Sequence, residues 1–201
     1  MIAPLRNRGG AIAIHPAVHN GAMTGLPEIP PDWFRWRLRR RGRNAPVVPD
    51  VPAQEIYAAM IKDVVSPALR EQGLVGSGGR YSIKSETHWM LLAFQKSWYS
   101  DSAEVRFTVN LMVVRRDDWD ELVRERPYYG KKPSAITTYG DPVRQVRIGE
   151  LVDDLEDKWW RIFSGQDMDT VQSDLLGNLI DVGLPWLRGQ VAETSARETP
   201  L

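Results

Sequence analysis

The sequence predicts an α+β fold, an antiparallel β-sheet meander with an N-terminal and a C-terminal helix packed on one face. Alternating apolar and polar residues at 88–98 and 103–115 indicate a central β-hairpin. Helical spacing of apolar residues precedes this hairpin at 54–72 and returns after residue 169. A helix, consecutive strands and a final helix are typical of a sheet that is covered on one face.

The second strand of the hairpin places its apolar side chains on one face, because side chains alternate along a strand. These residues are Ala103, Val105, Phe107, Val109, Leu111 and Val113. Residues 99–102, between the two strands, have turn composition. A turn centred between Ser100 and Asp101 predicts that Phe94 lies opposite Phe107 on the buried face.

The other face of the hairpin is partly polar. In the same register Gln95 lies opposite Arg106, and Leu91 lies opposite Asn110. Two interpretations remain open: another segment covers half of this face, or Gln95, Arg106 and Asn110 form the floor of a ligand or partner groove. Asparagine has poor strand propensity, so we expect the Asn110 amide either to hydrogen-bond the 127–142 loop or to reach a ligand beside Arg106.

The first helix is expected over residues 54–72, with a kink or break near Val65 and Ser66 because Pro67 follows them. Gly73 is a plausible helix stop. The glycine-rich residues 76–79 follow a helix and precede a strand at 80–84. That order is the reverse of a phosphate-binding loop, so we interpret them as a linker turn.

The C-terminal half begins with a short helix that ends at Glu125 and is capped by Asp117. An irregular stretch at 127–142 and strands at 144–148 and 158–163 are expected next. Asp169 can cap a last helix, which Pro185 breaks or kinks.

The adjacent residues Trp159 and Trp160 must point to opposite faces of their strand. We therefore expect one of them in the core and the other at the sheet edge or a partner interface.

The composition predicts one domain at residues 51–190, between a flexible Pro/Arg-rich N-terminal tail at 1–50 and a flexible C-terminal tail at 191–201. The absence of cysteine excludes disulfides, thiolate metal sites and cysteine nucleophiles. No apolar run approaches the roughly 18 residues of a transmembrane helix, and no secretory signal is recognisable. A cytoplasmic location is the expectation.

The charge is uneven along the chain, although the formal net charge is zero. Residues 1–52 hold eight arginines and three carboxylates, a net charge of +5, so the remaining residues carry −5. A mildly acidic body argues against nucleic-acid binding by the domain. The arginines from Arg35 to Arg43 adjoin the aromatic residues Trp33, Phe34 and Trp36, and this mixture suits a nucleic acid or an anionic membrane surface. The alternative is a disordered arginine-rich arm, or upstream sequence that is included because the true start lies further along the chain.

Six short motifs occur in order between residues 53 and 190. They are 67–73, 94–98, 105–111, 147–149, 158–160 and 184–187. Together they resemble a largely bacterial family of domains of unknown function that carries the number 4304. The resemblance implies the fold and the extent of the domain. It implies no activity, because none is established for the family.

Familiar catalytic motifs are absent: there is no Walker loop, no Gly-x-Ser-x-Gly and no His-Glu-x-x-His. His15 and His19 flank Pro16 in a segment without helical pattern, so metal binding is not expected there, and His88 suits a structural role. The acidic clusters at 117–121 and 153–157 consist of near-contiguous carboxylates, which splay apart rather than converge on a metal. We therefore expect neither a metal nor a cofactor.

The leading hypothesis is a noncatalytic binding or interaction protein, with an immunity- or antitoxin-like partner of another bacterial protein as one specific version. Its candidate ligand- or partner-binding residues are Gln95, Arg106, Asn110, Arg147 and Trp159. The alternative is an enzyme acting on a phosphorylated or nucleic-acid substrate, whose anionic groups would be held by Gln95, Arg106 and Arg147. Convergence of these residues on one concave pocket beside a carboxylate would favour the enzyme.

Overall fold

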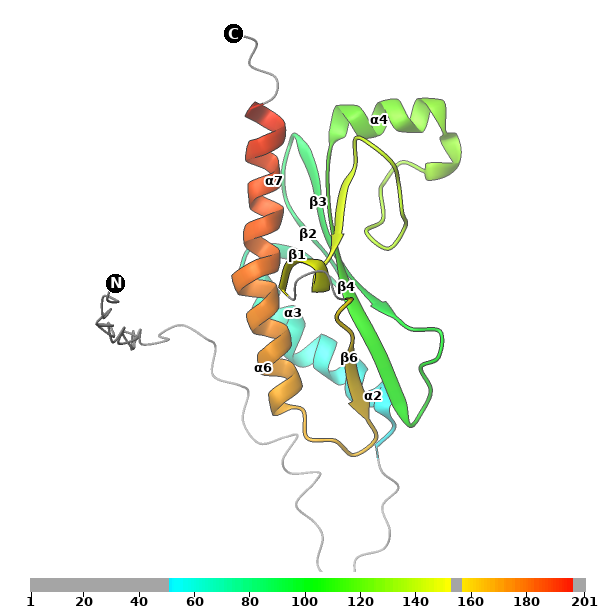
Figure 1. Cartoon of the computed structure of the whole chain (residues 1–201), viewed down its shortest axis with the longest axis vertical. Helices are drawn as coiled ribbons and strands as arrows, with labels where there is room; N and C mark the ends of the chain where they lie inside the picture. The colour runs from blue at the N-terminus through cyan, green and yellow to red at the C-terminus, as the bar shows by residue number, and fades with distance from the viewer. Residues whose placement is uncertain (1–50, 153–156, 197–201) are drawn as a thin grey trace, which may run out of the picture.

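An antiparallel sheet with the N-terminal and the C-terminal helices on one face forms the centre of the molecule, as the sequence predicts (Figure 1). The computed structural model describes residues 51–152 and 157–196. Within these ranges the sheet has six strands in the order β1-β2-β3-β4-β5, and β6 also pairs with β4. They are β1 (Leu74–Ser77), β2 (Arg80–Ile83), β3 (His88–Lys96), β4 (Glu104–Arg115), β5 (Arg144–Arg147) and β6 (Trp160–Phe163).

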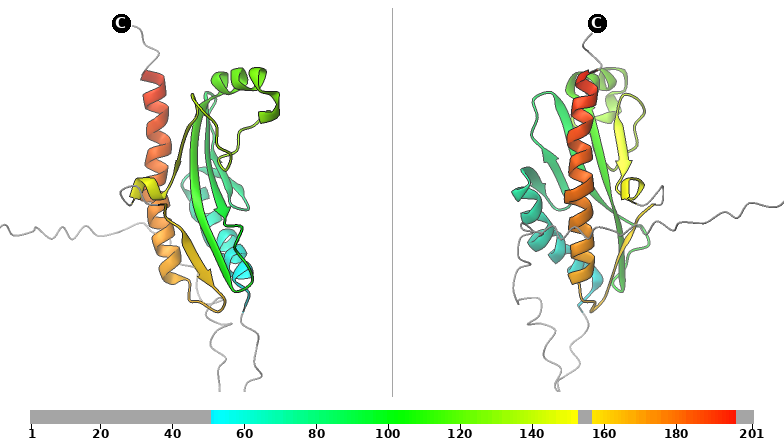
Figure 2. Two further views of the ribbon diagram at one scale, coloured as in Figure 1. Left: turned by 45° about the vertical axis from the view of Figure 1, so that its right-hand side comes forward. Right: turned by 60° about the vertical axis from the view of Figure 1, so that its left-hand side comes forward.

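Two helical rods cover the inner face of the sheet. The first consists of α2 (Ala53–Met60), η1 (Ile61–Val65) and α3 (Ser66–Glu71), and the second of α6 (Asp169–Asn178), η3 (Leu179–Gly183) and α7 (Leu184–Ala196). Both rods bury apolar side chains in one core with the inward residues of β3 and β4. Figure 2 shows the second rod along one side of the sheet and α4 (Arg116–Glu125) on the opposite side.

Each rod contains one π-helical turn that ends two residues before a proline. In the first rod the N–H of Ser66 donates to the carbonyl of Ile61, five residues back, and Pro67 follows. In the second rod the N–H of Leu184 donates to Leu179 in the same way, and Pro185 follows. A proline lacks an N–H and crowds the carbonyl four residues earlier, so a wider turn accommodates it. The irregularities expected at both prolines are therefore confirmed, and neither rod is interrupted.

The register of the central hairpin differs from the prediction by two residues. Phe94 pairs with Val109, and Phe107 pairs with Lys96. The shift arises in the turn, because the carboxylate of Asp101 accepts hydrogen bonds from the N–H groups of Ala103 (2.8 Å) and Glu104 (2.9 Å) and centres the chain reversal further along the chain. A two-residue shift preserves the faces. The alternate residues of β4 from Val105 to Val113 therefore lie in the core, as predicted.

Residues 76–79 contain a turn, as predicted, but it closes a β-hairpin and is not a linker between a helix and a strand. β1, which the sequence analysis did not predict, pairs with β2, and Ser77 lies opposite Arg80. The two residues between them, Gly78 and Gly79, both have positive φ (61° and 81°). This is the conformation that a two-residue hairpin with the right-handed strand twist requires, and glycine adopts it without steric cost.

The outer face of the sheet is half covered by a second apolar cluster. Met112 and Val114 of β4 pack there with Trp119 and Leu122 of α4 and with Ala135 of the 127–143 segment. That segment contains the short 3-10 helix η2 (Pro127–Tyr129) and is otherwise irregular, as expected. The interpretation that another segment covers half of this face is therefore correct.

Several predicted element ends move by a few residues. Asp117 and Asp169 lie within the first turns of α4 and α6, and the residues at the cap positions are Arg115 and Met168. Neither cap residue makes a side-chain capping bond, and the two aspartates place negative charge at the helix N-termini, where it is favourable. Asp117 also forms an ion pair with Arg115. A four-residue helix, α5 (Gly149–Val152), follows β5, and α7 runs on to Ala196. The expectations for residues 1–50, 153–156 and 197–201 lie outside the described residues.

Candidate functional site

The uncovered half of the outer face carries the sequence-predicted site residues. Side chains at even positions of β4 point to this face, because side chains alternate along a strand. The residues that pair with them on β3, β5 and β6 point to the same face. We call this surface the polar face; it comprises Gln95, Glu104, Arg106, Thr108, Asn110, Arg147, Trp159, Arg161 and Phe163. Trp160, next to Trp159, is buried on the inner face, so the two tryptophans separate as predicted.

Gln95 and Asn110 are bonded to each other near the middle of the polar face. The amide nitrogen of Asn110 donates to Oε1 of Gln95 at 2.9 Å. The expected bond from Asn110 to the 127–142 loop does not occur; the neighbouring strand supplies the partner instead, because the two-residue shift brings Gln95 opposite Thr108 and diagonal to Asn110. The hydroxyl of Thr108 is buried and has no hydrogen-bond partner among the described residues.

Arg147 and Trp159 form a second group around the carboxylate of Asp157. Arg147 makes an ion pair with Asp157. The indole N–H of Trp159 donates to the same carboxylate at 2.8 Å, and the Arg147 guanidinium lies 5.6 Å from the centre of a Trp159 ring. Asn110 and Arg147 are partners in the β4–β5 ladder, so the two groups are neighbours.

Arg106 belongs to a third group, in which one carboxylate holds two guanidiniums. Glu104 accepts from Nε of Arg106 at 2.8 Å and from Nε of Arg161, on the adjacent strand, at 2.5 Å. The bond from Arg161, followed by the one from Arg106, lowers the pKa of Glu104 to about 2. Both arginine side chains remain about half exposed, at 46% and 51%.

The five predicted site residues therefore share one sheet face but fall into three groups of contacts. Gln95 contacts Asn110, and Arg147 contacts Trp159, whereas Arg106 is held apart by Glu104. Glu104 and Asp157 are engaged by arginine side chains, and Glu150 accepts from the backbone N–H of Arg147 at 3.1 Å. Within the described residues, Arg106 and Arg147 thus pair with different carboxylates, whereas the enzyme alternative requires these residues to converge beside one.

Sequence reasoning missed the most exposed aromatic residues of the domain. Trp98 and Tyr99, in the loop between β3 and β4, are 98% and 89% exposed, and we call them the aromatic tip. They follow directly on the polar face, because the N–H of Ser97 donates to the carbonyl of Arg106 at 2.8 Å. The available signal was a Trp-Tyr pair at a position whose other residues, Ser100, Asp101 and Ser102, are turn formers.

The loop that carries the aromatic tip is held by a dense set of hydrogen bonds. The hydroxyl of Ser100 donates to the carbonyl of Arg106 (3.2 Å) and accepts from its N–H (3.1 Å). The N–H of Asp101 donates to the backbone carbonyl of Glu104 at 2.8 Å. The N–H of Ala53, at the start of α2, donates to the carbonyl of Ser102 at 2.8 Å and so connects the helix to the loop. The tip is therefore fixed in position although its side chains face solvent.

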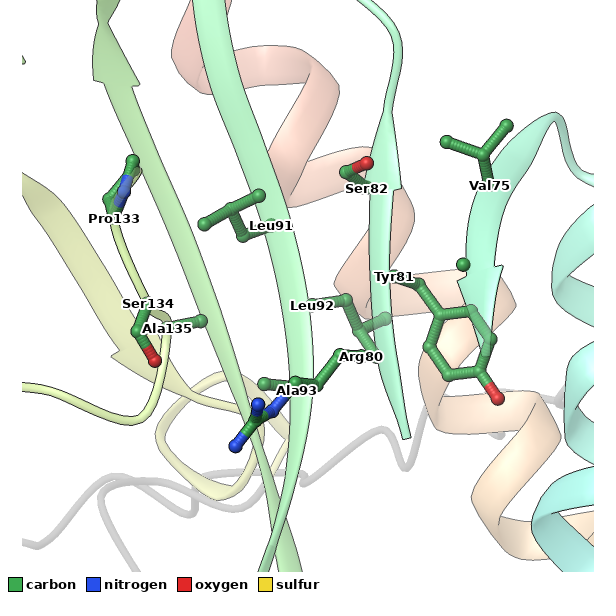
Figure 3. A pocket seen from close by; sticks show the side chains of 11 residues that line it. Val75, Arg80, Tyr81, Ser82, Leu91, Leu92, Ala93, Pro133, Ser134 and Ala135 are labelled. Carbon is green, nitrogen blue, oxygen red and sulfur yellow. The ribbon is translucent and has the colours of Figure 1, made fainter. Parts of the chain in front are cut away.

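A groove of about 310 Å³ lies elsewhere on the outer face, between the β1–β3 strands and residues 133–135 (Figure 3). Its polar side chains are Arg80, Ser82 and Ser134, and Leu91, Ala93 and Pro133 are among its apolar ones. None of the five predicted site residues lines it.

The comparison with protein families identifies one match, to a domain of unknown function, DUF4304, over residues 65–189. The chain belongs to this family. No curated protein and no solved structure matches it. The DUF4304 match begins at the end of η1 and includes every strand of the sheet, the aromatic tip and the groove. Because α2, which precedes the match, buries Ala53, Ile56 and Met60 in the core, the folded unit begins before residue 65.

None of the helices within residues 51–152 and 157–196 combines the length and the apolar character that a membrane-spanning helix requires. No three histidine, aspartate or glutamate side chains within residues 51–152 and 157–196 are grouped so that they could hold a metal ion.

Proposed function

We propose that this DUF4304 domain is a noncatalytic binding module that captures another protein through its aromatic tip and the adjacent arginines of the polar face. The observation that carries the proposal is the almost complete exposure of Trp98 and Tyr99 on a hydrogen-bonded loop. Exposing two large aromatic side chains forgoes the stabilisation that their burial would bring. A partner surface that covers them supplies that stabilisation on binding.

The chemistry of this surface suits a protein partner. Tryptophan, tyrosine and arginine are the residues that most often dominate the binding energy of protein interfaces, and Trp98, Tyr99, Arg106 and Arg161 lie at one end of the sheet. The loop is already held in place by Ser100 and Asp101. Binding therefore costs little loop-ordering entropy, which is the main advantage of a preorganised contact.

The charges beside the aromatic tip indicate what the partner presents. Arg106 and Arg161 share the single carboxylate of Glu104, so this group carries one net positive charge. An apolar pocket for Trp98 with carboxylates at its rim would complement the surface, because the half-exposed guanidiniums retain free donors. A cysteine-free chain suits a cytoplasmic partner. The more specific version, an immunity- or antitoxin-like role against another bacterial protein, rests on analogy with other small α+β domains.

The test compares the full chain with Trp98→Ala and Tyr99→Ala as baits for proteins from its source cells. Tyr128→Ala is the matched control, because Tyr128 is 79% exposed and lies in η2, which follows α4 after the end of β4 that is opposite the aromatic tip. We expect a protein that binds the wild type and the control equally and binds Trp98→Ala about thirtyfold more weakly when purified. The proposal fails if no captured protein distinguishes the tip variants from the control.

A further inference from the structure

The groove on the outer face has an apolar floor, and its deepest part is formed by the small side chain of Ala93. Ala93 of β3 lies between Arg80 of β2 and Asn110 of β4 in one row across the sheet. On the β2 side of the row Ser82 pairs with Leu91. Because Ala93 has only a methyl group, the flanking side chains rise above it and leave a depression between the strands.

The far wall of the groove is a fixed segment rather than a loose loop. The side-chain amide of Gln145 donates to the carbonyl of Ala135 at 2.7 Å, and the N–H of Ser134 donates to the hydroxyl of Tyr139 at 3.2 Å. Pro133 and Ala135 are buried, and Ala135 belongs to the second apolar cluster. The groove is therefore preformed, as ligand sites generally are.

Arg80 supplies the one charged group that lines this groove. Its side chain extends over Ala93 (Figure 3). The Arg80 guanidinium makes no hydrogen bond and no ion pair with the part of the chain that the structure describes. It differs in this from Arg106, Arg147 and Arg161 on the polar face, each of which pairs with a carboxylate. The hydroxyls of Ser82 and Ser134 add two further donors around the same space.

We propose that this groove binds a small organic carboxylate, with the carboxylate on Arg80 and an apolar body over Leu91 and Ala93. A guanidinium and a carboxylate match in shape and form two parallel hydrogen bonds. One guanidinium also matches the single negative charge of a carboxylate better than the charge of about −2 on a phosphate monoester. The volume of about 310 Å³ is at the lower end of small-molecule sites, so the ligand is small.

The groove and the aromatic tip are separate sites, so binding at one does not depend on a partner at the other. The groove is lined by residues of β1, β2, β3 and the 133–135 segment, and by no residue of the aromatic tip. A binding failure at the tip would leave the groove assignment intact, and the reverse also holds.

Lys131 and Lys132 directly precede Pro133 and raise the positive potential near the groove, which further favours an anion.

The test is an NMR titration of the full chain with three probes that share a phenyl ring and differ in the polar group: benzoate, phenyl phosphate and benzyl alcohol. We expect benzoate to bind most tightly, in the millimolar range suited to so small a ligand, and to shift the amide signals of Ala93, Ser82 and Ser134. Arg80→Gln should weaken benzoate binding at least about tenfold. Arg80→Lys keeps the charge but not the planar guanidinium, so its affinity for benzoate should lie between those of the wild type and Arg80→Gln. Lys84→Gln, at an exposed position just after β2, is the control and should bind as the wild type does.

Three results would overturn the proposal. Benzoate affinity that is unchanged in Arg80→Gln would remove Arg80 from the site. Shifts confined to residues outside the groove would place the binding elsewhere. Phenyl phosphate or benzyl alcohol binding as tightly as benzoate would contradict the carboxylate assignment. Both Arg80 variants should fold normally, because Arg80 is exposed and its side chain makes no hydrogen bond or ion pair with the described residues, so loss of binding would not reflect unfolding.

Discussion

Replacing Phe107 by alanine tests the face assignment of β4 most directly. Phe107 is fully buried on the inner face, where its ring lies 5.2 Å from Tyr57, 5.9 Å from Phe94 and 5.7 Å from Trp160, measured between ring centres. These partners come from α2, β3 and β6. The variant therefore removes a contact shared by the first helical rod and the sheet.

The magnitude follows from burial and from these three neighbours. A buried phenylalanine replaced by alanine costs about 3–5 kcal/mol of unfolding free energy, through lost transfer energy and the cavity left behind. Favourable aromatic pairs of about 0.5–1.5 kcal/mol each place Phe107 in the upper half of that range. We expect a loss of about 4 kcal/mol, which for a domain of this size lowers the melting temperature by roughly 15 °C.

The matched control is Thr108→Val, one residue along the strand on the opposite face. Thr108 is equally buried, but its hydroxyl has no partner among the described residues. Valine has nearly the same volume and removes only the unpaired hydroxyl, so stability should hold or rise by up to about 1 kcal/mol. A purely steric disturbance of β4 would lower the stability of both variants.

Urea denaturation of the full-length wild type and both variants, followed by tryptophan fluorescence and circular dichroism, measures these differences. Coincident transitions by the two probes justify a two-state treatment. A loss below about 2 kcal/mol for Phe107→Ala, or equal losses from the two variants, would refute the assignment of Phe107 to the core and of Thr108 to the outer face.

Three further predictions concern polar groups. Asn110→Val should cost about 1 kcal/mol, and a double-mutant cycle with Gln95→Leu should show coupling, because the two side chains are bonded at 2.9 Å; strictly additive losses would contradict this. The pKa of Glu104 falls from its ordinary 4.5 to about 2, mainly through the bond from Arg161, so its stabilising contribution is present above about pH 4.5 and is lost as the pH falls toward 2. Acid titration of Glu104→Gln should accordingly lack the part of the stability change that the wild type shows in that window. Burial, followed by the charge of Arg115, lowers the pKa of His88 below 6.5, so stability should decrease as the pH falls below 6.5, and a chemical-shift titration of the His88 ring with a midpoint at or above 6.5 would be inconsistent with this shift.

The sequence alone determined the architecture and the faces of its main strands. Strict alternation in β4 identifies Val105 to Val113 as inward residues in any even register, because the period of a strand is two. The prolines at 67 and 185 located both helical irregularities, because a missing N–H and a crowded carbonyl act within one turn of the chain. The same local patterns placed Gln95, Arg106 and Asn110 together on the outer face.

Only the tertiary structure decided the pairings and the surfaces that follow from them. Registers that differ by two residues bury the same side chains, so the hydrophobic pattern could not distinguish them. The hydrogen bonds that the Asp101 carboxylate accepts in the turn favour the observed register. That choice gave Asn110 its bond to Gln95 instead of one to the 127–142 loop. The exposure of Trp98 and the groove beside Arg80 depend on which segments pack over the sheet. Such long-range packing is not encoded in any local pattern of residues.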